Sequence, residues 1–188
     1  MTLAYAYEIV ENHYGDRKTK RSGQRLMRHI DEGLVILEHI GADEGTKAAY
    51  CLHPLVQENR DLEANWLWLA LDVKDPLVLV LTMEYRNIAN AFLSPMEEHK
   101  GYEDFRKIAI SPLYQVNQML VADKIQNRMD FLTYHKGIHP RSDWLDAYFE
   151  AWMKALEISD ERYEQFTAGL PGRLAKDALR KSRSGGPP

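Results

Sequence analysis

Two histidines and one aspartate have the types and positions that could do chemistry in this chain. His29 and His53 fall in stretches with helical spacing, and Asp123 stands in the run Leu120-Val121-Ala122-Asp123-Lys124-Ile125-Gln126-Asn127. Imidazole nitrogens and carboxylate oxygens are ligands that suit divalent transition metals. Such a metal can activate water against a phosphate. The three residues therefore predict a hydrolytic metal site, if the fold brings them together.

The elements that must position these residues are predicted to be helices. Apolar residues recur with helical spacing along most of the chain, and strict alternation is scarce, which predicts an all-α fold. A short link after the second helix permits a helical hairpin that would pair the two histidines. The expected helices cover residues 2–13, 24–40, 46–58, 61–71, 76–93, 112–134, 142–156 and 160–169, and the longest loop covers residues 94–111.

Two positions in the third expected helix carry specific expectations. Thr46 is a candidate N-cap, since a hydroxyl can accept a hydrogen bond from a free backbone amide of the first turn. Pro54 removes one backbone hydrogen bond and clashes with the preceding turn, so this helix should kink or end at His53.

The whole chain predicts one ordinary domain. Its 188 residues suit one core, and a formal net charge of −4 makes nucleic acid an unlikely partner. The single Cys51 has no intramolecular partner, which fits a reducing, cytoplasmic location, and no apolar run is long enough to predict a membrane span. We expect a domain over 1–170 and a C-terminal segment, 171–188, that is disordered from about residue 181.

Two segments of the chain resemble a known enzyme family. Arg21-Ser22-Gly23, His29, Ala48-Ala49 and Leu52-His53 resemble the hydrolase half of the RelA/SpoT alarmone enzymes, which belong to the HD metal-dependent phosphohydrolases. The run from Val121 to Asn127 resembles the Leu-Ala-Asp-Arg-Leu-His-Asn segment of that family. The two matches cover roughly residues 4–60 and 112–135 and keep the family's order and spacing.

The resemblance implies an HD-type helical domain and assigns roles to particular residues. His29, His53 and Asp123 would hold a divalent metal such as manganese or zinc. The basic loop before the first histidine would bind phosphate through cationic side chains and backbone amides. The residues that the resemblance implies for nucleotide binding are Lys20, Arg21, Ser22 and Asn127.

The chain departs from the family at the signature pair. The family has His-Asp where this chain has His53-Pro54, so one metal ligand is missing. The acidic pair that follows in the family stands here as Gln57-Glu58, and Glu58 is the expected proton shuttle. Glu58 or Asp61 could replace the lost carboxylate if the chain turns at the proline.

Two functions of different classes remain open on the sequence alone. The first is a metal-dependent phosphohydrolase that cleaves a phosphoester or pyrophosphate of a nucleotide or alarmone. The second is a catalytically inactive HD-like scaffold that binds a nucleotide or a protein partner, and a homodimer is open for either. His135, His139 and Arg141 could form a second phosphate site, although a helix end and a turn are the favoured interpretation.

Overall fold

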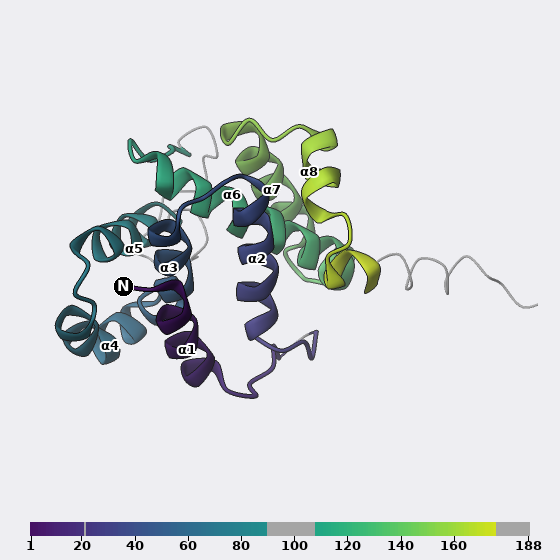
Figure 1. The fold of residues 1–188 in the computed structure, drawn as a ribbon. Helices are drawn as coiled ribbons and strands as arrows, with labels where there is room; N and C mark the ends of the chain where they lie inside the picture. The colour runs from purple at the N-terminus through teal and green to yellow at the C-terminus, as the bar shows by residue number, and fades with distance from the viewer. Residues whose placement is uncertain (21, 90–107, 176–188) are drawn as a thin grey trace, which may run out of the picture.

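The expected all-α fold is confirmed by the structure. The computed structural model describes residues 1–20, 22–89 and 108–175, and no strand occurs within these ranges (Figure 1). The nearest approach to a sheet there is one isolated antiparallel bridge between Lys18 and Arg25. In the same ranges, no helix combines the length and apolar character that crossing a membrane requires.

The helices follow the expected order with small shifts at their ends. Their bounds are α1 Leu3–Tyr14, α2 Met27–His39, α3 Glu44–Leu52, the 3₁₀ turn η1 His53–Leu55, α4 Asn59–Asp72, α5 Pro76–Ala89, α6 Tyr114–Asp130, the π-turn η4 Phe131–His135, α7 Ser142–Ala155 and α8 Asp160–Thr167. Most of the expected loop 94–111, the end of the expected helix 76–93 and the tail from 181 lie outside the described residues.

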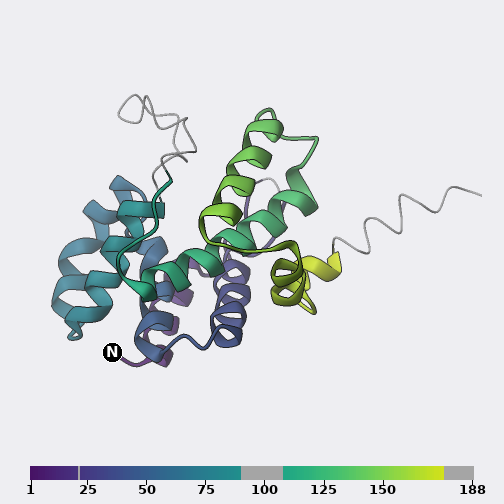
Figure 2. The same ribbon diagram turned by 90° about the horizontal axis from the view of Figure 1, so that it is seen from above.

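Helix α6 is the central element of the fold. It crosses the molecule and contacts α2, α3 and α5 on one side and α7 and α8 on the other (Figures 1 and 2). A helix enclosed in this way must bury residues around its whole circumference. The residues of α6 that are buried include apolar and polar ones: Val116, Gln118, Met119, Leu120, Ala122, Asp123, Lys124, Ile125, Gln126 and Met129.

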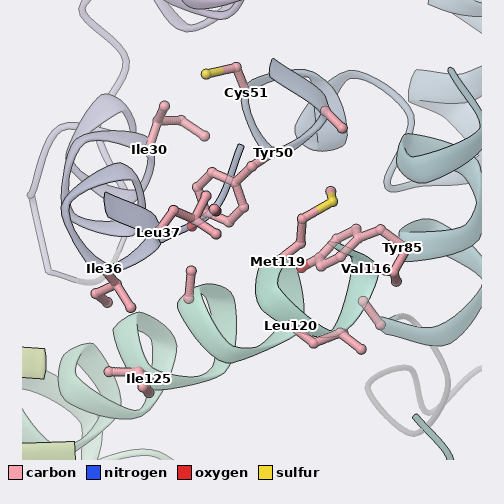
Figure 3. Packing of buried hydrophobic residues seen from close by; sticks show 14 of the residues in the cluster. Ile30, Ile36, Leu37, Tyr50, Cys51, Tyr85, Val116, Met119, Leu120 and Ile125 are labelled. Atoms are coloured by element: carbon pink, nitrogen blue, oxygen red, sulfur yellow. The ribbon is translucent and has the colours of Figure 1, made fainter. Parts of the chain in front are cut away.

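The core fills the space between α2, α3, α5 and α6. Figure 3 shows Tyr50 of α3 beside Leu37 of α2, and Tyr85 of α5 beside Met119 of α6. Cys51 is fully buried in this core, and burial raises the pKa of its thiol to about 12. Its packing within the core matches the role that its apolar surroundings predict.

The third helix ends where Pro54 predicts. Its α-helical part stops at Leu52, and His53–Leu55 continue as a single 3₁₀ turn before α4 starts at Asn59. The expected start of this helix is wrong by two residues. Asp43 caps it by accepting a hydrogen bond from the Thr46 amide at 2.7 Å, so Thr46 donates through its backbone and does not cap with its hydroxyl.

Gly33 allows α2 and α3 to approach closely. A β-carbon on Gly33 would lie 2.0 Å from the hydroxyl oxygen of Tyr50, far inside van der Waals contact. Tyr50 cannot easily withdraw, because it is fully buried and its hydroxyl donates to the backbone carbonyl of His29 at 3.3 Å.

The Gly33→Ala variant should therefore be destabilised by overpacking, by about 1–3 kcal/mol or more in the free energy of unfolding. Gly45→Ala is the matched control, since its β-carbon would meet its nearest neighbour at an ordinary 3.4 Å. Urea unfolding of both variants and the parent protein measures the difference. Equal stability of the two variants would contradict the close approach of α2 and α3.

Candidate metal centre

The three predicted ligands meet at one point in the fold. One ligand atom from each of His29, His53 and Asp123 lies within 4.8 Å of the others. The Nε2 atoms of the two histidines are 3.3 Å apart, and His29 Nε2 is 3.4 Å from Asp123 Oδ1. The side chains come from α2, η1 and α6. The fold thus brings the three side chains together, at distances that ligands of one metal ion can have.

Both imidazole rings turn the same nitrogen toward this point. His53 Nδ1 lies 2.6 Å from the carbonyl oxygen of Tyr50, which can only accept, so Nδ1 carries the proton. His29 Nδ1 lies 2.6 Å from the side-chain oxygen of Gln126 and donates to it. In the neutral rings the lone pairs therefore sit on the two Nε2 atoms. Metal-binding histidines are held in the same way, by a partner on the second ring nitrogen.

Asp123 turns its two carboxylate oxygens to different partners. Oδ2 accepts from the ammonium of Lys124 at 2.9 Å, and Oδ1 accepts from Asn127 Nδ2 at 2.9 Å while facing His29. Burial alone would raise the pKa of Asp123, but Lys124 and His29 outweigh it and hold this pKa well below its usual range. Oδ1 is thus the ionised oxygen that can serve as a ligand beside the imidazoles.

The two histidines differ in their affinity for a proton. Burial, reinforced by the neighbouring His29, lowers the pKa of His53 to about 3. Burial acts on His29 in the same direction, but Asp123 outweighs it and raises the pKa of His29. A proton on His29 Nε2 can point at His53 Nε2 and Asp123, so an ion bound to these three atoms would have to displace it.

Two members of the cluster, His29 and Asp123, line an open pocket, while His53 is buried and does not line it. This pocket has a volume of about 200 Å³ and is lined by Tyr14, Thr19, Arg25, Leu26, Arg28, His29, Gln57, Asp123, Gln126, Asn127 and Asp130. A larger pocket of about 420 Å³ adjoins it and shares Thr19, Gln57, Asn127 and Asp130. A molecule that extends across both spaces can therefore reach His29 and Asp123.

The structure places only one residue of the predicted catalytic pair, Gln57 and Glu58, at the pockets. Gln57 lines both pockets. Glu58 is exposed at the N-cap of α4 and lines neither of them. Among the described residues, no fourth histidine, cysteine or acid joins the cluster, so neither Glu58 nor Asp61 supplies the further carboxylate that the family resemblance led us to expect.

Of the predicted nucleotide-binding residues that the structure describes, only Asn127 lines the pockets. Asn127 lines both pockets and donates to Asp123. Lys20 is exposed in the loop before α2, and Ser22 is hydrogen-bonded to the Thr19 hydroxyl. Lys20 and Ser22 line neither pocket, whereas Thr19 lines both. Arg21 lies outside the described residues.

Several residues of the site do not follow from the sequence arguments above. Gln126 and Asp130 reach the pocket from α6, and Arg28 reaches it from α2, where its guanidinium contacts Asp130. One signal could have found the residues of α6. Residues 123, 126, 127 and 130 are polar and recur at positions that share one helix face.

The lowered pKa of His53 makes stability depend on pH. Because the unfolded chain binds a proton near pH 6.5 and folded His53 near pH 3, acid favours the unfolded state. His29 acts in the opposite sense, since its raised folded pKa adds stability below the unfolded value. In a His53→Asn variant the amide can still donate to the Tyr50 carbonyl. This variant removes the acid destabilisation due to His53 and keeps the contribution of His29.

When the pH is lowered from about 7 to about 5, we expect the free energy of unfolding to change by different amounts in the parent protein and in His53→Asn. The parent protein should become less stable relative to His53→Asn, by up to about 2 kcal/mol. Denaturant unfolding at the two pH values measures this difference. The same pH dependence in both proteins would contradict a neutral, buried His53.

No match to this chain was found among models of protein families, among curated proteins or among solved structures. The resemblance to the alarmone hydrolases accordingly stays a prediction from the sequence.

Proposed function

We propose that this protein is a metal-dependent phosphohydrolase of the HD type that acts on a nucleotide. The observation that supports the proposal is the convergence of two Nε2 lone pairs and one carboxylate oxygen within 4.8 Å, at a place where His29 and Asp123 line a pocket. Two imidazoles and a carboxylate fit a divalent ion such as zinc or manganese, with positions left open for water and substrate. A metal held there would polarise a phosphate and lower the pKa of a bound water.

The phosphate of the substrate would lie beside the basic side chains of the smaller pocket. Arg28 is held in place there by Asp130 and by the Tyr134 hydroxyl, which it reaches at 3.1 Å. Arg25 lines the same pocket and remains largely exposed, so its guanidinium can approach a phosphate. The loop residues Lys20, Arg21 and Ser22 belong to this proposal as further phosphate contacts.

The nucleoside would occupy the larger pocket. Its apolar wall includes Phe131 and Phe149, whose ring centroids are 5.5 Å apart, and Leu145. Aromatic and aliphatic walls of this kind suit the flat face of a base. The same pocket is also lined by His135, His139 and Arg141, for which the sequence favours a helix end and a turn over a second phosphate site.

A proton acceptor is needed when water attacks. Gln57 can hold a water by hydrogen bonds but cannot accept its proton. Asp130 lines both pockets, and burial raises its pKa in spite of the nearby Arg28. We therefore propose Asp130 for the role that the sequence assigns to Glu58.

One observation favours the alternative of a scaffold without catalysis. Lys124 neutralises Asp123 inside the fold, so the cluster needs no metal to balance the carboxylate charge. The fourth family ligand is also replaced by Pro54. Such a protein would bind a nucleotide or a protein partner without turnover.

Metal analysis separates the two functions. We expect the purified protein to bind close to one equivalent of zinc or manganese and to release phosphate from one member of a panel of mono-, di- and triphosphate and alarmone nucleotides. His53→Ala and Asp123→Asn should each lose the metal and lower turnover by several orders of magnitude, because each removes a ligand.

His39→Ala is the control for these variants, since His39 lies on α2 and its ring contacts only the backbone of the exposed helix end. Circular dichroism checks that each variant is folded. A parent protein that binds nucleotide, takes up no metal and releases no phosphate even with added manganese would establish the scaffold.

The larger pocket gives a separate prediction. Leu145→Trp should fill part of it and raise KM for the nucleotide by about tenfold, equivalent to about 1.4 kcal/mol, while metal content stays unchanged. Leu71→Trp on the exposed face of α4 is the control. An unchanged KM would place the nucleoside elsewhere.

A further inference from the structure

A chain of buried hydrogen bonds leads from His29 to the last described turn of the protein. His29 Nδ1 is 2.6 Å from Gln126 Oε1, Gln126 Nε2 is 2.9 Å from Glu32 Oε2, and the Gly172 amide is 2.7 Å from Glu32 Oε1. Glu32 and Gln126 are each 1% exposed. Water therefore does not compete for these contacts.

We propose that Glu32, held by the Gly172 amide, is a positioning residue that fixes the tautomer of His29 through Gln126. The proposal rests on the proposed function in that it treats His29 Nε2 as a metal ligand. The proposal adds Glu32, Gln126 and the segment at Gly172 to the residues that support the site.

The direction of each hydrogen bond follows from Glu32. An ionised carboxylate only accepts, so Gln126 must turn its amide nitrogen toward Glu32 and its oxygen toward His29. That oxygen also only accepts, so His29 must carry its proton on Nδ1. The lone pair of neutral His29 is thereby left on Nε2, which faces His53 and Asp123.

The Gly172 amide determines how a side chain at position 32 must be oriented. This amide donates to Oε1 of Glu32, so the position requires an acceptor. The turn is also closely packed. A β-carbon on Gly172 would lie 2.6 Å from Met129 Cε and 3.2 Å from Glu32 Oε1. Residues 171–175 are helical and Leu170 is buried, so this segment is part of the folded structure.

Glu32→Gln should reverse the chain of donors and acceptors without changing its shape. The new amide must keep its oxygen toward Gly172, so its nitrogen faces Gln126. Gln126 then turns its oxygen toward position 32 and its nitrogen toward His29. We expect the neutral His29 ring to change from the Nδ1–H to the Nε2–H tautomer, which blocks the nitrogen that faces the cluster.

Long-range ¹H–¹⁵N NMR of the metal-free protein reads the tautomer directly. The spectra are recorded at about pH 9, where ordinary imidazoles are neutral and carboxyls ionised. His29 should appear as Nδ1–H in the parent protein and as Nε2–H in Glu32→Gln. Glu38→Gln is the matched control on the same helix, because Glu38 is exposed and pairs with Lys47.

Zinc titration gives the functional readout. Glu32→Gln should weaken zinc binding by about tenfold or more, the effect typical of lost partners of a metal-binding histidine. Gln126→Leu should weaken it similarly and remove the preference of His29 for the Nδ1–H tautomer. Gln118→Leu controls for the loss of a buried glutamine of α6, since the Gln118 side chain donates to the Ile40 carbonyl at 3.3 Å.

The outcomes separate this inference from the proposed function. A parent His29 in the Nε2–H form, or a Glu32→Gln protein that keeps Nδ1–H, overturns the inference even if zinc binds. A switched tautomer in a protein that never binds zinc supports the positioning role and overturns the metal site. If Glu32→Gln does not fold, Gln126→Leu decides, and a retained Nδ1–H preference there overturns the inference.

Discussion

The ion pair of Asp123 and Lys124 inside the fold is the constraint on which the rest of the structure depends. Both side chains are almost completely buried, and burying two charges costs several kcal/mol per ion unless they are well paired. Asp123 meets this requirement with Lys124, Asn127 and His29, while Lys124 also lies 5.0 Å from the ring of Trp152. Helix α6 can pass through the centre of the molecule because its polar residues are paired in this way.

The same pairing defines the chemistry of the cluster. Lys124 occupies one oxygen of Asp123, so a bound ion would meet only the other oxygen. Pro54 ends α3, which places His53 on a 3₁₀ turn with its Nδ1 directed at the Tyr50 carbonyl. The residue at which the sequence departs from the HD pattern that it resembles therefore lies where the backbone orients the His53 ring.

Support for the cluster extends well beyond its ligands. Glu32 and Gln126 connect His29 to the turn at Gly172, and Gly33 lets Tyr50 pack against the backbone of His29. These contacts come from four separate parts of the sequence. Their common effect is to hold two imidazole rings with the same nitrogen inward.

The amino-acid sequence by itself determined the helical class, the approximate helices and the break at Pro54, because these depend on local periodicity and backbone sterics. Family-like order and spacing also singled out His29, His53 and Asp123. Only the tertiary structure decided that these side chains meet, that Asp130 and Gln57 share their pocket while Glu58 does not, and that Glu32 lies behind His29. Such contacts join residues far apart in the chain, so they follow from how the helices pack around α6.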